Sequence, residues 1–232
     1  MAKKPVNPII GDSNRVLGDD EIDSALPINQ NQLKNTKVYT SREDYIDSLP
    51  DNLKFMEVGV AWGYYSKLVA DKKNPSLIHL VDRFDNEMLC WSGRKFGQCL
   101  CEPKHEKTYT PETHEAFILN LFEDYNLTTF RGYSKNILPN IKDTYDYIYL
   151  DITNDRPTIR TALWDASKLI KPGGIIGIND YTIYDGIIDD SPYGTFQAVN
   201  EFLYFNKDWS VDAIALHVLG FYDIYIKKSL NE

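Results

Sequence analysis

Short apolar segments alternate along this chain with segments of helical periodicity, and this alternation limits the possible folds more than any other feature. The apolar segments are continuous, which is typical of strands buried on both faces of a sheet. Residues 157–170 show the helical pattern, with one apolar face formed by Ile159, Ala162, Leu163 and Ala166. Strands that alternate with helices imply a parallel sheet covered on both faces. The strands are predicted at 55–60, 77–82, 128–132, 145–151, 175–179, 209–216 and 220–226.

The last two predicted strands need a different connection. The linker between 209–216 and 220–226 is too short for a crossover helix, so these strands should pair antiparallel. We therefore predict an α/β fold with a seven-stranded, mostly parallel sheet, a terminal antiparallel strand pair and helices on both faces.

The chain divides into a tail, one domain and an insertion. Residues 1–36 are polar and rich in Asn, Asp and Pro, which indicates a loosely attached tail or arm. The same segment could instead cover a site or form an oligomer contact. Residues 37–232 have the length of a single domain. Within it, residues 83–110 form a polar insertion that could be part of a substrate lid.

Composition narrows the partners. The formal net charge is −9, and no block of lysines and arginines stands apart from it, so nucleic acid is disfavoured as a partner. The apolar runs are too short to cross a membrane, and the N-terminus lacks an apolar signal core. Three cysteines without framework spacing indicate free thiols. We expect a cytoplasmic protein without a membrane partner; its oligomeric state is left open, and a homodimer is compatible with the sequence.

A glycine turn follows the first predicted strand of the parallel sheet. Glu57, Gly59 and Gly63 lie between that strand and a helix. Gly59 lets the backbone approach a ligand closely, and the N-terminus of the helix offers N–H groups to a carboxylate. Asp82 ends the next strand, where an acid can accept hydrogen bonds from both ribose hydroxyls. These residues predict a site for a nucleoside with a charged tail.

The glycine turn and Asp82 belong to a longer series of motifs: 57–63, Asp82, 132–134, 147–151, 169–175 and 179–181. Together these motifs resemble class I S-adenosylmethionine (SAM)-dependent methyltransferases, over about residues 41–227. Within the class, the likeness is to small-molecule O-methyltransferases of the macrocin and catechol type. It implies a Rossmann-like fold and SAM as cofactor, with Gly59 and Gly63 framing the methionine part, Asp82 holding the ribose and Ser134 near the adenine. The predicted cofactor site comprises Glu57, Gly59, Val60, Trp62, Gly63, Asp82, Arg83, Tyr133, Ser134 and Asp151.

Oxygen-bearing side chains follow the next two strands of the sheet. Asp151 ends one strand, and Asn179 and Asp180 end its neighbour. The carboxyl ends of parallel strands meet at one edge, so these three side chains could hold Mg²⁺ and a substrate hydroxyl. Alternatively, Asp151 caps the following helix and Asp180 bonds loop backbone. Asp151 and Asp180 are the predicted catalytic residues.

Three positions differ from the catechol type that the chain resembles. The pair after the fifth strand reads Asn179-Asp180, in the inverse order. Asn154 stands where the catechol type carries a catalytic lysine, so the base is either another residue or a metal-bound hydroxide. Tyr65 stands where a serine is often found, and Ser66 comes one residue later.

The predicted function is SAM-dependent methyl transfer to a hydroxyl of a small molecule or sugar. Two alternatives stay open: a non-catalytic module that binds SAM or a nucleotide, and an NAD-dependent Rossmann enzyme. Glu57 stands where the NAD motif has its first glycine, which weakens the NAD alternative. A zinc site at Cys99, Cys101 and His105, completed by Cys90 or His114, is a further alternative to a plain inserted loop.

Overall fold

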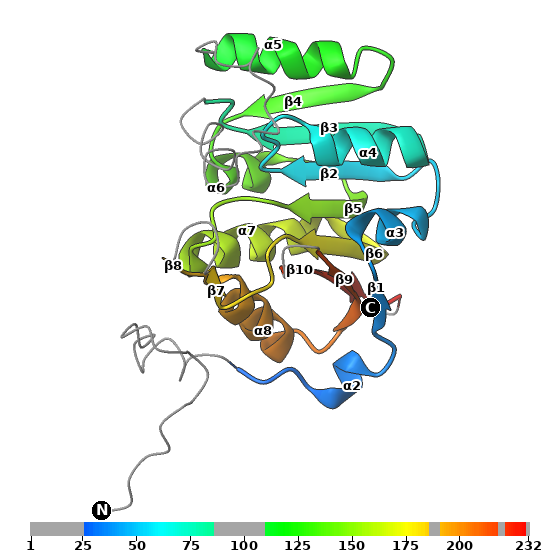
Figure 1. Ribbon diagram of the computed structural model, residues 1–232, viewed down its shortest axis with the longest axis vertical. Coiled ribbons are helices and arrows are strands. Elements are labelled where there is room, and N and C mark those ends of the chain that lie inside the picture. The colour runs from blue at the N-terminus through cyan, green and yellow to red at the C-terminus, as the bar shows by residue number, and fades with distance from the viewer. Residues whose placement is uncertain (1–25, 86–109, 186–190, 218–220, 231–232) are drawn as a thin grey trace, which may run out of the picture.

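The structure, a computed structural model, describes residues 26–85, 110–185, 191–217 and 221–230. In this part of the chain, eight strands form one sheet in the order β1-β9-β10-β6-β5-β2-β3-β4 (Figure 1). The strands are β1 (Lys37–Tyr39), β2 (Lys54–Val58), β3 (Leu77–Asp82), β4 (Leu127–Arg131), β5 (Tyr145–Leu150), β6 (Ile170–Ile178), β9 (Trp209–Leu216) and β10 (Tyr222–Lys228). A separate antiparallel pair is made by β7 (Tyr184–Asp185) and β8 (Ser191–Pro192).

Seven helical segments of the α type and one 3₁₀ helix connect the described strands. They are α2 (Gln30–Leu33), α3 (Arg42–Asp47), α4 (Tyr64–Lys73), α5 (Pro111–Leu121), α6 (Ser134–Ile137), η2 (Leu138–Asn140), α7 (Arg156–Leu169) and α8 (Thr195–Phe205). None of the helices in the described ranges is long and apolar enough to cross a membrane.

The sheet has the predicted mixed character. Strands β2 to β6 run parallel to one another, while β10 is antiparallel to both β6 and β9. The predicted α/β fold with a terminal antiparallel pair is confirmed. The predicted number of seven strands is wrong, because β1 adds an eighth strand, which is parallel to β9. Strand β1 has only three residues, and its apolar residue Val38 is exposed, so the sequence shows no strand periodicity there.

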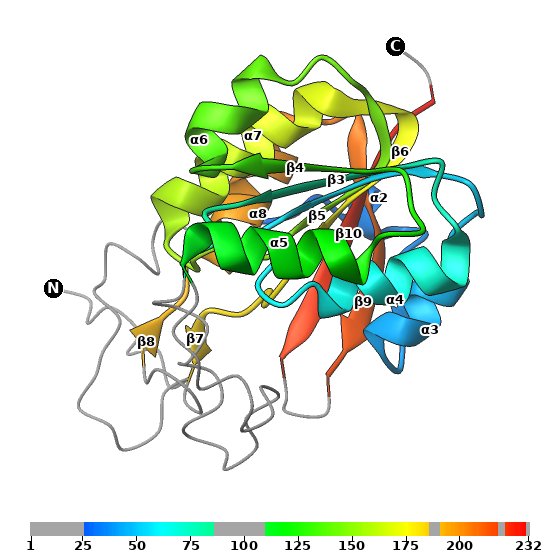
Figure 2. The same cartoon turned by 90° about the horizontal axis from the view of Figure 1, so that it is seen from above.

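Helices cover both faces of the sheet. Figure 2 shows α3, α4 and α5 on one face and α6, α7 and α8 on the other. The face under α7 and α8 is mainly aliphatic, with residues such as Ile148, Ile176 and Ile178. The opposite face is rich in tyrosine: Tyr45, Tyr65, Tyr147, Tyr149 and Tyr225 are all buried there.

The link between α7 and β6 departs from the prediction. Asp155 caps α7 by accepting from the Thr158 N–H at 2.9 Å, and Pro157 lies in the first turn. The helix ends at Leu169, and β6 begins at once at Ile170. The strand predicted at 175–179 therefore begins five residues earlier, and residues 172–174 lie within it, where the pairing register with β5 shifts.

Part of the polar N-terminal segment packs against the domain. Asn29 and Gln32 form a capping box at α2. The buried Gln32 amide donates to the carbonyls of Leu203 at 2.8 Å and Trp209 at 2.9 Å. Residues 1–25 lie outside the described part of the chain.

Candidate cofactor and active site

The carboxyl end of β2 is the switch point of the parallel sheet. From β2 the chain passes to β3 on one side, whereas β5 pairs on the other side. Ligands of open α/β sheets bind in the crevice that such a reversal creates. The glycine turn 59–63 starts there, between β2 and α4.

Gly59 lies where only a glycine fits. Its φ is +86°, and a Cβ added to it would stand 1.7 Å from the carbonyl oxygen of Asp151. The Gly59 N–H donates to the Val81 carbonyl at 2.8 Å. The turn therefore joins the ends of β3 and β5 through backbone atoms, and this contact needs the missing side chain.

Asp82 holds the turn through its carboxylate. Oδ2 accepts from the N–H groups of Val60 at 2.6 Å and Ala61 at 3.2 Å, and Oδ1 accepts from the Phe84 N–H at 2.7 Å. Ala61 has a positive φ of 46°, so these bonds help to hold a backbone conformation that L-residues rarely adopt. A carboxylate has about four acceptor positions, so Asp82 keeps capacity for a ribose hydroxyl.

The helix after the turn can receive a carboxylate. Gly63 is the N-cap of α4, has a φ of +76° and carries no side chain that could cap the helix. The first turn of α4 carries no acidic residue. Its N–H groups and the helix dipole suit an anionic group such as the carboxylate of an amino acid.

Glu57 points away from the open side of the turn. Its side chain is buried and accepts a hydrogen bond from Ser66 of α4. Burial raises the pKa of Glu57 well above its usual range, against the lowering effect of the Ser66 bond. In this structure Glu57 braces β2 against α4, and the serine that follows Tyr65 is its partner.

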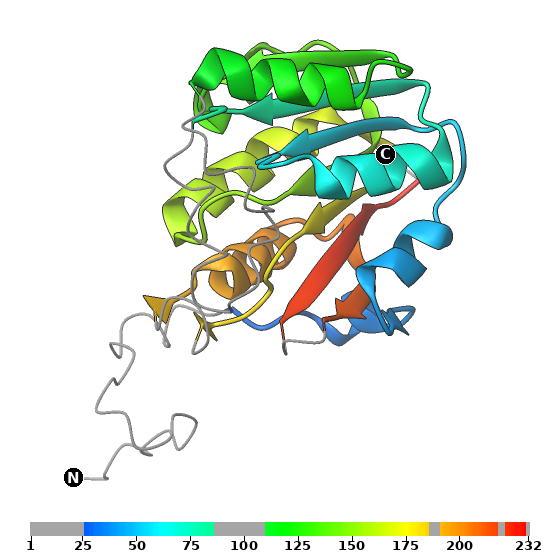
Figure 3. The same ribbon diagram turned by 45° about the horizontal axis from the view of Figure 1, so that its top comes forward.

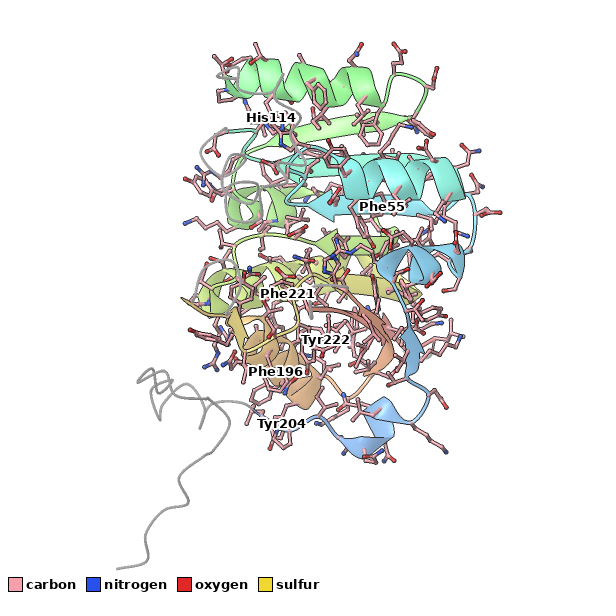
Figure 4. All side chains as sticks on the ribbon, viewed as in Figure 1. Phe55, His114, Phe196, Tyr204, Phe221 and Tyr222 are labelled. Atoms are coloured by element: carbon pink, nitrogen blue, oxygen red, sulfur yellow. The ribbon has the colours of Figure 1, made fainter. Side chains whose placement is uncertain are left out.

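Helix α5 covers the other side of the glycine turn. His114 Nε2 lies 2.8 Å from the carbonyl oxygen of Ala61, and Figure 4 shows this side chain on the sheet side of α5. The ring of Trp62 packs against the rings of His114 and Phe117, with centroid distances of 5.1 and 5.5 Å. Trp62 is thus buried under α5. Cys90, Cys99, Cys101 and His105 of the zinc hypothesis lie outside the described residues.

The ends of β3 and β4 bring the remaining predicted cofactor residues together. The guanidinium of Arg83 lies 5.0 Å above the ring of Tyr133 and pairs with Asp85. The Gly132 N–H donates to the Asp82 carbonyl at 2.8 Å, and α6 begins at Ser134. Tyr133 is 54% exposed, so a flat aromatic surface is accessible beside Asp82.

A second group of polar side chains lies at the ends of β5 and β6. The amide Nδ2 of Asn179 donates to Asp151 Oδ1 at 3.1 Å. The amide oxygen of Asn179 accepts from Arg42 Nη2 at 3.0 Å, and the same Nη2 lies 3.2 Å from Asp223 Oδ1. The Tyr149 hydroxyl donates to Asp223 Oδ2 at 2.8 Å. These five residues form one hydrogen-bonded group, here called the Arg42 network.

The charged groups of this network change one another's pKa values. Burial raises the pKa of Asp151 from 3.8 to about 6; Arg42 lowers it, while Asp223 and Asp82 raise it further. Burial also raises the pKa of Asp223, against the lowering effect of Arg42. Burial acts to lower the pKa of Arg42, but Tyr149 and the two acids hold it above its ordinary value. Arg42 therefore stays charged, and Asp151 can take up a proton near neutral pH.

The predicted magnesium ligands do not form a metal site in this geometry. A guanidinium only donates, so the group of Asn179 that faces Asp151 is its NH₂, which cannot bind a cation. Asp180 follows with a φ of +50°, and its carbonyl accepts from the Thr182 N–H at 2.7 Å. In the described ranges, no three or more His, Cys, Asp or Glu side chains are grouped as metal ligands. The residues present do not fit Mg²⁺.

The loop after β6 is tied to the β9–β10 hairpin. The Tyr181 N–H donates to the Tyr222 carbonyl at 2.7 Å, and the Tyr181 hydroxyl donates to Asn200 of α8 at 2.6 Å. Figure 4 places Phe221 and Tyr222 near this loop and Phe196 on α8 below it. The rings of Phe196 and Tyr181 pack with their centroids 5.0 Å apart, so an aromatic pair lies at the loop that follows Asn179.

Sequence reasoning missed three members of the Arg42 network. Arg42 is the first residue of a short helix, and no pattern marks it. Tyr149 reads as an ordinary strand residue. The signal that the sequence offered was Asp223, an acid within an apolar strand, β10. In the structure its side chain is 2% exposed.

No protein-family model and no curated protein match this sequence. Solved structures of methyltransferases share its fold. The O-methyltransferase TomG from Streptomyces achromogenes, in complex with SAM, is 16% identical with a TM-score of 0.55, covering 81% of this chain and 79% of that one. An rRNA methylase from Streptococcus thermophilus is 11% identical with a TM-score of 0.53, covering 82% and 95%. An O-methyltransferase family protein from Burkholderia thailandensis is 12% identical with a TM-score of 0.54, covering 82% and 56%. At these identities the likeness shows a common fold.

Proposed function

We propose that the protein is a SAM-dependent methyltransferase that methylates a hydroxyl of a small molecule or sugar. The observation that carries the proposal is the glycine turn 59–63, held by Asp82 at the switch point of a sheet shared with methyltransferases of known structure. The macrocin and catechol type is the subgroup proposed for it. We expect the enzyme to act in the cytoplasm, without a nucleic-acid or membrane partner.

Each part of the proposed cofactor site has a separate role. The N-terminus of α4 receives the methionine carboxylate, Asp82 one ribose hydroxyl, and Tyr133 with Ser134 the adenine. Arg83 and the backbone of Val60 complete its walls, and Trp62, buried under α5, supports the turn from behind. Glu57 acts indirectly, because it fixes α4 through Ser66.

The proposed reaction places Asp151 beside the acceptor hydroxyl. Bound SAM supplies a methyl group on a positively charged sulfur. The acceptor oxygen forms a bond to the methyl carbon as the carbon–sulfur bond breaks, and the acceptor proton passes to Asp151. Its pKa of about 6 suits a general base near neutral pH. Asp180, next to Asn179, orients the acceptor.

The net charge of −9 supports a small acceptor over RNA. The aromatic residues around Tyr181 and Phe196 suit an acceptor with an apolar ring or a sugar face. The solved relatives named above include both O-methyltransferases and an rRNA methylase, so the acceptor class needs a direct test.

Calorimetric titration with S-adenosylhomocysteine (SAH) tests the cofactor site. We expect micromolar binding to the wild-type protein, strong weakening in Asp82→Asn and no binding of NAD. Asp146→Asn is a matched control. Asp146 also accepts a hydrogen bond from a backbone N–H, that of Lys54 at 2.8 Å, but it lies at the opposite end of the strands. NAD binding without SAH binding would revive the Rossmann-enzyme alternative.

A second experiment separates an enzyme from a binding module. The protein is incubated with SAM carrying a labelled methyl group and a panel of catechols, hydroxylated macrolides, sugars and an rRNA fragment. We expect label in a small hydroxylated compound, and at least about tenfold less in Asp151→Asn at equal SAH affinity. SAH binding with no transfer to any acceptor would favour a non-catalytic module.

A further inference from the structure

We propose that the Arg42 guanidinium takes the position of a divalent cation at the ends of β5 and β6, making this site independent of metal. Arg42 is then a positioning residue, which fixes Asn179 and through it Asp151. The catalytic meaning of this inference rests on the proposed function. The charge arrangement itself can be tested without an acceptor.

The extra strand β1 delivers Arg42 to this edge of the sheet. Tyr39 of β1 lies opposite Ala215 of β9, and Ala215 lies opposite Asp223 of β10. Ile224, the next residue, lies opposite Ile178, the last residue of β6. The end of β1 is therefore level with Asn179.

The chain turns directly from β1 into α3 at this level. Ser41 caps α3 by accepting from the Asp44 N–H at 3.1 Å, and Arg42 is the first residue of the helix. Figure 3 shows α3 beside α4 and the β9 side of the sheet. The guanidinium thus comes from outside the seven strands that the sequence predicted.

The neighbours of the guanidinium are those that a cation would have. Arg42 Nη2 contacts the carboxylate of Asp223 at 3.2 Å and the amide oxygen of Asn179 at 3.0 Å. Asn179 links Arg42 to a second acid, because its NH₂ group donates a hydrogen bond to Asp151. The ring of Tyr65 lies 5.9 Å from the guanidinium carbon, a further favourable contact for a cation.

Two acids in a partly buried site require a positive charge. The Asp223 side chain is 2% exposed, and hydroxyls of Tyr149 and Tyr225 also bind it, at 2.8 and 3.2 Å. Arg42 supplies the charge with five donors in a fixed plane and without coordination bonds. A metal ion at the same point would meet the guanidinium at close range, and like charges there are unfavourable.

The test is the binding of Mg²⁺ alone, measured by calorimetry in the presence and absence of SAH. We expect no binding heat with the wild-type protein. Arg42→Gln removes the charge and leaves the acids and Asn179, so it should gain a saturable Mg²⁺ binding heat that the wild-type protein lacks. Arg42→Lys keeps a positive charge and should behave as wild type.

Two further variants define the origin of the effect. Arg42→Gln combined with Asp223→Asn should lose the gained Mg²⁺ affinity, because one acid is gone. Lys72→Ala removes another cation near α3, which pairs with Asp47 at 2.7 Å on the surface, and should not create a Mg²⁺ site. If Arg42→Gln folds poorly, Mg²⁺ should still raise its melting temperature by about 3 °C, with no effect on wild type.

Stoichiometric Mg²⁺ binding to the wild-type protein would overturn the proposal. Equal absence of Mg²⁺ binding in wild type and Arg42→Gln would also overturn it, since the acids would then form no cation site. SAH serves as a separate readout: its failure to bind any variant would refute the proposed function, while the Mg²⁺ comparison would still decide the role of Arg42.

Discussion

The proposed ligand site lies at the carboxyl ends of the parallel strands and has two halves, one at β2 and β3 and the other at β5 and β6. The two halves are built in different ways. At the ends of β2 and β3, Asp82 is half-buried and accepts three backbone N–H groups from Val60, Ala61 and Phe84. At the ends of β5 and β6, Asp151 and its neighbours bind side chains, and a buried charge is balanced by Arg42. The first half depends on main-chain geometry and the second on charge.

This difference has a functional meaning for the proposed enzyme. A cofactor of constant structure can be bound by backbone groups, which every sequence with the right turn supplies. An acceptor and its proton need side chains whose charge is set by their surroundings. Substitutions at the contact between the halves, or within one half alone, should therefore have different consequences.

Gly59→Ala should have the largest effect, because it acts where the halves touch. The new Cβ would stand 1.7 Å from the Asp151 carbonyl, a backbone atom that cannot rotate away. We expect a loss of about 4 kcal/mol or more in the free energy of unfolding. Urea unfolding measures this. Gly132→Ala is the control: it also has a positive φ, but its Cβ would meet the Ile137 side chain at 3.3 Å, so the loss should be smaller.

Arg42→Ala tests the charged half alone. It leaves Asp223 buried without its cation, so we expect a loss of about 3 kcal/mol in unfolding free energy. Adding Asp223→Asn should restore part of that loss, because the uncompensated charge is removed. Lys72→Ala, at an exposed ion pair, should cost less than about 0.5 kcal/mol. Equal costs for Arg42→Ala and the double variant would show that charge is not the cause.

Asp82→Asn tests the backbone-built half. The carboxamide offers one acceptor instead of two, and its NH₂ would face a backbone N–H. We expect SAH affinity to fall about 30-fold, close to 2 kcal/mol. Calorimetry measures this, with Asp146→Asn as the variant that should keep full affinity. An unchanged affinity in Asp82→Asn would remove the assigned ribose contact.

The most gradual effect concerns pH, because it is spread over about two pH units. The pKa of Asp151 is raised from 3.8 to about 6 on folding, so the folded protein binds this proton more tightly than the unfolded chain. Its contribution to stability should therefore decrease by about 1 kcal/mol for each pH unit as pH rises from about 4 to about 6, and then level off. The difference in urea unfolding between wild type and Asp151→Asn measures it.

Asp71→Asn should show the opposite sign in the same experiment. A hydrogen bond from Lys67 and a second from Tyr125 lower the pKa of Asp71 in the folded state. Its contribution is therefore present above its unfolded pKa and is lost as pH falls. The same pH slope in both variants would contradict the assignment of the shift to Asp151.

Much of the backbone-built half could be predicted from the sequence. Gly59 and Asp82 were predicted to lie together, and the structure joins their segments through the Val60 N–H. Both are close in sequence to strands whose apolar runs are easily recognised. Glu57 was predicted at the same turn, but the sequence did not indicate that its side chain turns inward to Ser66.

The charged half was only partly predictable. Asp151 and Asn179 do converge, as the parallel strands required. The predicted metal between them was replaced by a contact that joins Arg42 and Asp223, which are 181 residues apart in the chain. No periodicity relates such positions, and the short β1 that brings them together has no readable pattern.

The sequence by itself determined the parallel α/β sheet, its antiparallel end and the glycine turn. These features depend on apolar periodicity and on local backbone conformation, which neighbouring residues specify. Only the tertiary structure decided which charge stands beside Asp151 and Asn179. That choice depends on the register of β1, β9, β10 and β6, because a guanidinium acts at hydrogen-bond distance and four strands must align to place it there.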